Sequence, residues 1–152
     1  MHSASEHAIH TILVGQSGGP TTAINASLAG IIRAAHVQGL RVLGMRNGIQ
    51  GFLEGNVVDL IEVLELEKPK LGALKQAGTN LGEKNLQLLR KTPSSWLGSC
   101  RFKLPELEAN SASGASSKST ANSESTAVSP IYQQIDAQLK KYQVDAVLYI
   151  GG

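Results

Sequence analysis

Residues 11–45 constrain the fold of this chain more than any other segment. Residues 11–14 form a short run of β-forming side chains, which predicts a first strand. Across residues 23–37 the apolar side chains recur at helical spacing, and residues 41–45 predict a second strand. A strand, a helix and a strand within about 35 residues make a βαβ unit, which requires parallel pairing and a right-handed crossover. The sequence therefore predicts an α/β fold with a doubly wound parallel sheet, in a Rossmann-like arrangement of three layers.

Later segments supply further elements of the same kind. We expect a short strand over 57–60, helices over 59–66 and 83–91, an amphipathic helix over 132–142, and a buried strand over 144–150. Asn47, Gly48 and Gly51 predict a loop after the second strand. Residues 92–101 are rich in turn-forming residues and predict a second loop.

Composition excludes several classes of partner. The chain has 14 basic and 12 acidic residues and a net charge of +2, too balanced to favour nucleic acid or an anionic membrane. A small phosphorylated metabolite needs only local donors and is not excluded. Cys100 is the single cysteine, which rules out an internal disulfide, and residues 1–10 do not resemble a signal peptide. No apolar run approaches the roughly 20 residues that cross a bilayer. These features predict a cytoplasmic protein.

Residues 109–129 consist almost wholly of Ser, Ala, Thr, Asn and Gly. Such a segment cannot bury enough apolar surface to offset the entropy of ordering it. We expect a disordered, Ser-rich surface insertion without a function of its own. A phosphorylated regulatory loop is the alternative.

The first segment with a chemical signature is the turn between the first strand and helix, residues 15–22. Gly18 and Gly19 lack the Cβ atoms that would keep an anion away from the backbone, and the following helix directs its free amides to the same point. Thr21 or Thr22 is expected to cap that helix. The turn lacks the Gly-Lys-Ser/Thr ending of a Walker A loop and the Gly-x-Gly-x-x-Gly dinucleotide pattern. It is either a phosphate cradle or a purely structural turn.

Two more segments carry possible chemistry. Arg101 lies in a loop of Gly and Ser residues, where a guanidinium can stabilise charge on phosphoryl oxygens, although a lone Arg is more often a solvated charge. Gly151 and Gly152 follow the predicted last strand, and ligands of open parallel sheets bind beyond the carboxyl ends of strands. A simple turn is the alternative for this glycine pair.

Together the three segments resemble one family. The runs Gly15-Gln-Ser-Gly-Gly-Pro-Thr-Thr-Ala-Ile-Asn-Ala-Ser-Leu-Ala-Gly30, Leu97-Gly-Ser-Cys-Arg-Phe-Lys103 and Tyr149-Ile-Gly-Gly152 are similar, in order and spacing, to the amino-terminal motifs of phosphofructokinases. The first two runs are more similar to the pyrophosphate-using branch. The resemblance implies that residues 1–152 are the amino-terminal part of the domain that binds the phosphoryl donor.

The resemblance implies roles for individual residues. Gly19, with Gly18 beside it, would contact the phosphoryl donor through its backbone amide. Arg101 would bind the phosphates in the transition state, and Phe102 would line the donor site. Gly152 would be the first donor-site residue of a Gly-[Asp/Asn]-x-Ser motif. The family's magnesium partner would come just after Gly152, so no metal ligand is expected within the chain.

The chain also departs from the family pattern. The Thr-Ile-Asp-Asn-Asp motif, which holds the family's catalytic base, is absent from these residues. Residues 68–82 and 109–129 look like insertions. Ile49 falls where many ATP-using members carry a Tyr, which weakly favours pyrophosphate as the donor.

The implied activity is Mg²⁺-assisted phosphoryl transfer from pyrophosphate or ATP to the 1-hydroxyl of fructose 6-phosphate, by an enzyme that is a homo-oligomer at full length. This chain would carry only part of the donor site and would be inactive alone. Two alternatives stay open at this point: a non-catalytic phosphate- or nucleotide-binding module, such as a truncated regulatory relative, and a flavodoxin-like binding domain unrelated to kinases.

Overall fold

The computed structural model describes residues 8–66, 81–105 and 129–151. Four strands and five helices follow one another along these residues: β1 (Thr11–Gln16), α1 (Thr22–Val37), β2 (Arg41–Met45), α2 (Gly48–Leu53), β3 (Val57–Asp59), α3 (Leu60–Val63), α4 (Leu81–Lys91), α5 (Pro130–Lys141) and β4 (Ala146–Ile150).

The strands form one sheet in the order β3-β2-β1-β4. β1 pairs in parallel with β2 on one side and with β4 on the other, which confirms the predicted βαβ unit and the α/β fold. β3 pairs antiparallel with β2, so the sheet is mixed at this edge. The chain between β2 and β3 is short, and a short connection returns the chain antiparallel more easily than it makes a parallel crossover.

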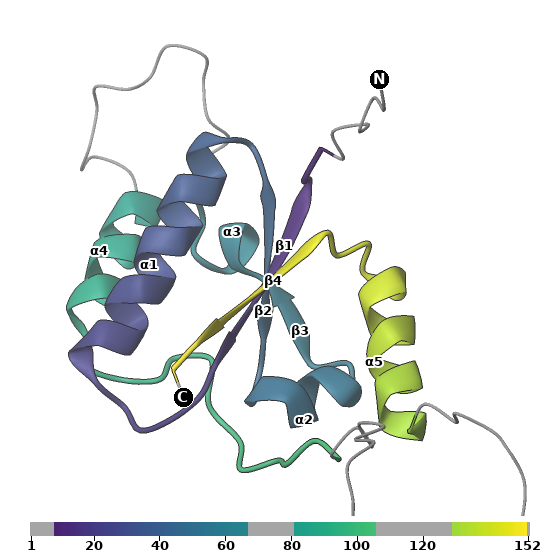
Figure 1. Ribbon diagram of the computed structural model, residues 1–152. Helices are drawn as coiled ribbons and strands as arrows, with labels where there is room; N and C mark the ends of the chain where they lie inside the picture. The colour runs from purple at the N-terminus through teal and green to yellow at the C-terminus, as the bar shows by residue number, and fades with distance from the viewer. Residues whose placement is uncertain (1–7, 67–80, 106–128, 152) are drawn as a thin grey trace, which may run out of the picture.

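Helices cover both faces of the sheet, in the three layers that the sequence predicts. Alternate side chains of β1 point to opposite faces, as the two-residue period of a strand requires. Ile12 and Val14 pack into a core with α1, α3 and α4. Leu13 packs into a second core with α2 and α5. Figure 1 shows α1 and α4 on one side of the strands and α5 on the other.

The start of α1 matters for the site because it follows the glycine turn. Thr21 is the N-cap residue, and its hydroxyl accepts a hydrogen bond from the Ile24 amide at 3.4 Å, which confirms the predicted cap. The helix buries an apolar stripe against the sheet, and Asn25 is buried within that stripe. Its end is marked by Gly39, whose φ is +71°.

Two elements differ from the prediction. Residues 48–53, which were expected to be loop, form the short helix α2, because burying Phe52 against the sheet outweighs the local turn signals of the glycines. The helix predicted over 59–66 is only one turn, α3. Glu65 follows it with a φ of +57°, a left-handed conformation that an α-helix cannot continue through.

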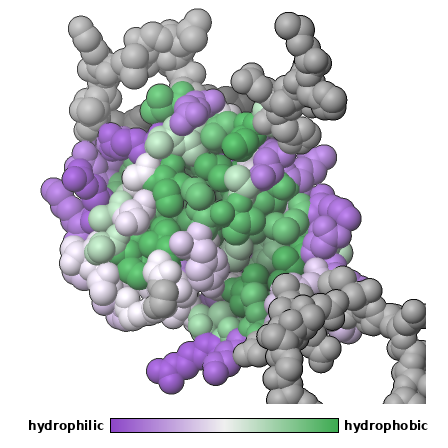
Figure 2. Space-filling model, in the orientation of Figure 1, coloured by the Kyte–Doolittle hydropathy of each residue, from purple (hydrophilic) through white to green (hydrophobic). Residues whose placement is uncertain are grey.

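The prediction that the last strand is buried is wrong. Val147, Leu148 and Tyr149 are 46%, 39% and 45% exposed. The cause is the strand order, since β4 lies at an edge of the sheet and has only β1 as a neighbour among the described residues. Figure 2, in the same orientation as Figure 1, shows the hydrophobic surface that faces the viewer. β4 crosses in front of the other strands on this side.

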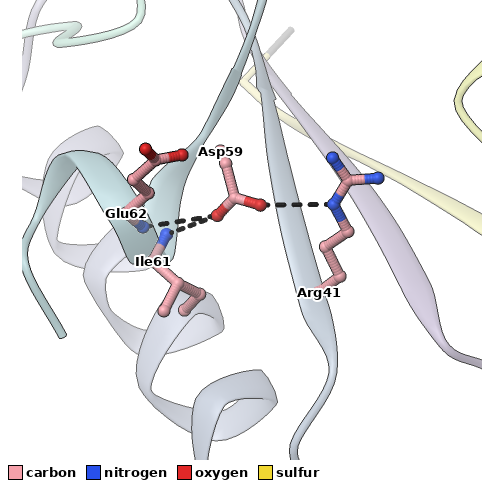
Figure 3. A network of polar contacts seen from close by, with 4 residues as sticks. All are labelled: Arg41, Asp59, Ile61 and Glu62. Atoms are coloured by element: carbon pink, nitrogen blue, oxygen red, sulfur yellow. Dashed lines mark hydrogen bonds and ion pairs between the residues drawn. The ribbon is translucent and has the colours of Figure 1, made fainter. Parts of the chain in front are cut away.

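A polar network ties β2 to β3 and α3. The Asp59 carboxylate accepts from the backbone amides of Ile61 and Glu62 at 3.1 and 3.3 Å, and so caps α3. Its other oxygen lies 3.2 Å from Nε of Arg41 (Figure 3). Arg41 is the first residue of β2, at the amino end of the parallel strands. The network therefore has a structural role, remote from the carboxyl ends where ligands of such sheets bind.

Two predicted segments lie mostly or partly outside the residues that the structure describes. The Ser-rich insertion over 109–129 lies outside the described residues except for Ser129, which precedes α5. The insertion over 68–82 also lies outside them, apart from Leu81 and Gly82, the first two residues of α4. No helix in the described ranges is long and apolar enough to span a bilayer.

Candidate functional site

The glycine turn meets the end of β4 at the carboxyl edge of the sheet. The Ser17 amide donates a hydrogen bond to the Ile150 carbonyl at 2.9 Å. Gly151 has a φ of +102°, and a Cβ at this position would lie 2.2 Å from the Ser17 carbonyl oxygen. Only glycine allows this approach. The first and third segments singled out in the sequence are therefore in direct contact.

The turn itself presents an open backbone. Gly18 has a φ of +82°, which a side chain would strain. A Cβ at Gly19 would have no heavy atom within 4 Å, and Gly19 is not among the glycines with positive φ. Both residues are exposed and stand before the sixteen-residue helix α1. Free amides and the positive end of the helix dipole make such a position suitable for an anion.

The loop that carries Arg101 is fixed at Leu97. The Leu97 amide donates to Oε1 of Gln16 at 2.8 Å, and the Leu97 carbonyl accepts from the Asn47 amide at 2.8 Å. The Leu97 side chain is 1% exposed. Gly98 follows with a φ of +81° against Asn47, where a Cβ would lie 2.4 Å from Oδ1. The loop thus enters the carboxyl edge of the sheet in one defined path.

Cys100 brings the loop next to the ends of β2 and β4. A Cβ at Gly48 would lie 3.0 Å from Sγ of Cys100 and 2.9 Å from the Tyr149 hydroxyl. Arg101 follows Cys100 directly and is exposed, and among the described residues no hydrogen bond or ion pair holds its guanidinium. Figure 1 shows residues 92–105 passing the same end of the sheet as the turn before α1.

The Tyr149 side chain lies next to several segments at the carboxyl end of the strands. Its ring lies against Gly15, where a Cβ would come within 2.5 Å of Cε2. Burial raises the pKa of the Tyr149 hydroxyl, the nearby Cys100 thiol raises it further, and a hydrogen bond with the backbone of Ile49 opposes the shift. The phenol therefore stays neutral at physiological pH, and its polar contact is with the backbone of Ile49.

Replacing Tyr149 with Phe should make the free energy of unfolding fall less steeply above pH 10. The pKa of folded Tyr149 lies above the unfolded value of about 10, so the folded state keeps a proton that the unfolded state releases. This contribution is complete below pH 10 and is lost as the pH rises through the folded-state pKa. Denaturant unfolding at several alkaline pH values measures it. Tyr132→Phe is the control, and equal slopes for the parent and Tyr149→Phe would contradict the assignment.

The described residues do not form a metal site by themselves. No group of three or more His, Cys, Asp and Glu side chains that could hold a metal ion occurs in the described ranges. Mg²⁺ commonly takes one or two carboxylates and the oxygens of a bound phosphate.

The glycine turn and the anchored start of the Arg101 loop lie at one end of the sheet. Gly18 and Gly19 lie in the turn there, and the chain that contains Arg101 and Phe102 follows the anchored Leu97. Gly152 lies outside the described residues. The individual roles of these residues remain predictions.

Sequence reasoning missed the polar side chains that hold these segments together. Gln16 and Asn25 are both 0% exposed. Asn25 left a signal, because it interrupts the apolar stripe of α1 that faces the sheet. Gln16 left a weaker one, as an amide two residues after a run of β-forming residues.

Comparison with known proteins decides the family. The phosphofructokinase family model matches residues 11–152. This chain belongs to the phosphofructokinase family. The match confirms the resemblance seen in the three motifs, and it rejects the alternative of a flavodoxin-like domain unrelated to kinases.

Individual relatives share this assignment. The chain is 30% identical to a pyrophosphate–fructose 6-phosphate 1-phosphotransferase from Xanthomonas campestris, over 93% of this chain and 25% of that protein. It is 31% identical to an ATP-dependent 6-phosphofructokinase from Aliivibrio salmonicida, over 90% of this chain and 29% of that protein. The crystal structure of a pyrophosphate-dependent phosphofructokinase from Nitrosospira multiformis superposes with a TM-score of 0.60 at 28% identity, over 95% of this chain. The chain spans 27% of that structure.

Proposed function

We propose that this phosphofructokinase-family chain forms part of the phosphoryl-donor site of an enzyme that phosphorylates the 1-hydroxyl of fructose 6-phosphate. The observation that carries the proposal is the open backbone at Gly19. It lies before the amino end of α1, at the same end of the sheet as the anchored loop of Arg101. A diphosphate bound there would accept hydrogen bonds from the turn and meet a guanidinium that no described residue engages.

Pyrophosphate is the donor we favour, and ATP is the alternative. Three relatives at 30–35% identity are named pyrophosphate–fructose 6-phosphate 1-phosphotransferases. A relative at 31% identity is named an ATP-dependent enzyme, so the names alone do not choose the donor. Ile49 adds weak support for pyrophosphate, because the family resemblance puts it where many ATP users carry a Tyr.

The chain's own residues would act on the donor by binding and by charge. Backbone amides of Gly18 and Gly19 would orient the phosphates, and Arg101 would balance the negative charge that spreads over the phosphoryl oxygens in the transition state. Phe102 and Gly152 would complete the wall of the donor site. Bound Mg²⁺ would supply further charge neutralisation, held largely by the phosphate oxygens because the described residues offer no cluster of acids.

The 152 residues do not contain the Thr-Ile-Asp-Asn-Asp motif that holds the family's catalytic base. We therefore expect these residues alone to bind a donor without turnover.

We also propose a cytoplasmic location, which fits the single cysteine, and a homo-oligomeric full-length enzyme by analogy with the family.

Replacing Gly19 with Val should weaken the binding of Mg²⁺-pyrophosphate by at least about tenfold, because the branched side chain would occupy the space where phosphate approaches the backbone. A Cβ at this position meets no protein atom, so the substitution should leave the fold intact. Isothermal titration calorimetry measures the affinity. Gly30→Val is the matched control, since Gly30 also has nothing within 4 Å and lies in the middle of α1. Parental affinity in Gly19→Val would reject the proposed contact.

A further inference from the structure

We propose that Gln16 and Asn25 are positioning residues that set the Arg101 loop against the glycine turn. The anchoring is independent of the chemistry, and only its consequence for phosphate binding rests on the proposed function. The amide side chains of Gln16 and Asn25 form a buried pair beneath the candidate site, and together they bond to four residues of the loop over 92–97.

Gln16 uses both ends of its side-chain amide. Its Nε2 donates to the Ile24 carbonyl and to Oδ1 of Asn25, each at 3.3 Å. Its Oε1 accepts from the Leu97 amide at 2.8 Å and from the Ser95 hydroxyl at 3.4 Å. Gln16 is 0% exposed, so water cannot replace any of these partners.

Asn25 holds the same loop from the helix side. Its Nδ2 donates to the Thr92 carbonyl at 3.0 Å, and its Oδ1 accepts from the Trp96 amide at 3.0 Å. These partners lie 67 and 71 residues away along the chain, so the bonds fix tertiary structure and not a local turn. Asn25 is also 0% exposed.

The backbone partners leave one orientation for each side chain. The amides of Trp96 and Leu97 can only donate, so each must face a side-chain oxygen. The nitrogen of Gln16 must then face Ile24 and Asn25, and the nitrogen of Asn25 must face Thr92. A fully bonded amide pair of this kind specifies a single arrangement, whereas an apolar pair would let the loop slide.

The pair lies between the two segments whose relative position determines the geometry of the candidate site. Gln16 is the last residue of β1, two residues before Gly18, and Asn25 is in the first turn of α1. Leu97, held by Gln16, stands four residues before Arg101. A shift of the loop relative to β1 would therefore move the guanidinium away from the open backbone at Gly19. A displacement of about 1 Å can cost a bound or reacting group on the order of a hundredfold.

Trp96 provides a direct measurement of the anchoring. It is the only tryptophan in the chain, it belongs to the anchored loop, and the Arg46 guanidinium lies 5.9 Å from its ring centroid. Tryptophan fluorescence of the full chain, excited selectively over the three tyrosines, therefore reports on this loop alone. Gln16→Met keeps the size of the side chain but removes both donors and the amide oxygen. We expect acrylamide quenching of Trp96 to increase at least about twofold, and Mg²⁺-pyrophosphate affinity to fall about tenfold or more.

Leu43→Ala is the matched control. It weakens the core on the opposite face of the sheet without touching the network, so a general loss of stability appears there as well. It should lower the melting temperature but leave Trp96 quenching and pyrophosphate affinity close to the parental values. Asn25→Leu should reproduce the effects of Gln16→Met, and the double variant should add little, because both side chains act through one network.

Where Gln16→Met does not fold, Asn25→Leu makes the same test, since it removes the bonds to Thr92 and Trp96 of the loop. Parental quenching and affinity in whichever of the two variants folds would overturn the inference. So would equal changes in Leu43→Ala. A parent chain that binds no pyrophosphate, while quenching still responds to Gln16, would reject the proposed function and leave the anchoring supported.

Discussion

Replacing Arg101 with Ala should lower kcat of the full-length enzyme by about a thousandfold, with a much smaller change in the KM for the donor. A guanidinium that meets phosphoryl oxygens is most useful when negative charge spreads over them in the transition state, and arginines in this role contribute about 10³ to 10⁵ in kcat. The loop geometry supports the assignment, because Leu97 is bonded on both sides while Arg101 itself stays exposed and without a described partner.

Two further variants make the Arg101 test specific. Arg101→Lys should restore only part of the rate, because an ammonium keeps the charge but lacks the planar fork that binds two oxygens. Lys103→Ala removes the same charge two residues away and should stay within a few-fold of the parent. Steady-state kinetics with the donor varied measure all three. Values of kcat and kcat/KM near the parental ones in Arg101→Ala would refute the role of this residue.

The largest loss of stability should come from Gly51→Ala, at about 4 kcal/mol or more. A Cβ at Gly51 would lie 1.8 Å from the Arg46 carbonyl oxygen, and the obstacle is backbone and not a flexible side chain. The surrounding chain cannot move easily, because the Arg46 amide is bonded to the Asn56 carbonyl and the Asn56 amide to the Gly51 carbonyl. Whole domains are stable by only about 5–15 kcal/mol, so this variant should be largely unfolded or close to it.

Gly30→Ala is the control for Gly51→Ala and should act in the opposite direction. Gly30 lies in α1, and a Cβ at this position would have no heavy atom within 4 Å. Alanine is favoured over glycine inside a helix by up to about 1 kcal/mol, so this variant should be more stable than the parent. Denaturant unfolding of the two variants compares them. A Gly51→Ala protein as stable as the parent would show that α2 does not pack against Arg46 as described.

The sequence predicted the elements whose signals are local. β1, α1 and β2 follow from runs of β-forming residues, helical spacing and a threonine cap, all within one short segment. α2 was not predicted, because its glycines signal a turn and its stability comes from the burial of Phe52 against strands elsewhere in the chain. The exposure of β4 was not predicted either, since an apolar run indicates a strand but not which strand lies beside it.

In the candidate site too, the features with local sequence signals were predicted and those that depend on distant contacts were not. The glycine turn was predicted because two adjacent glycines, Gly18 and Gly19, can be recognised from the sequence as a flexible backbone without side chains. The pair Gln16 and Asn25 was not predicted, because the backbone groups that these two side chains bond lie some 67 to 81 residues away. No spacing rule connects positions so distant, and only the folded loop shows that these amides are fully bonded.

Pairing of β4 with β1 sets the order in which this chain can fold. The Asp145 carboxylate accepts hydrogen bonds from the amides of His10 and Thr11, 135 and 134 residues earlier. The unit of β1, α1 and β2 can form from its own short contacts, but closing a loop of that length carries an entropic cost that must precede any gain from the pairing. During synthesis on the ribosome, one side of β1 therefore has no partner strand until nearly all of these residues have emerged. In that interval the free side of β1 is open to mispairing.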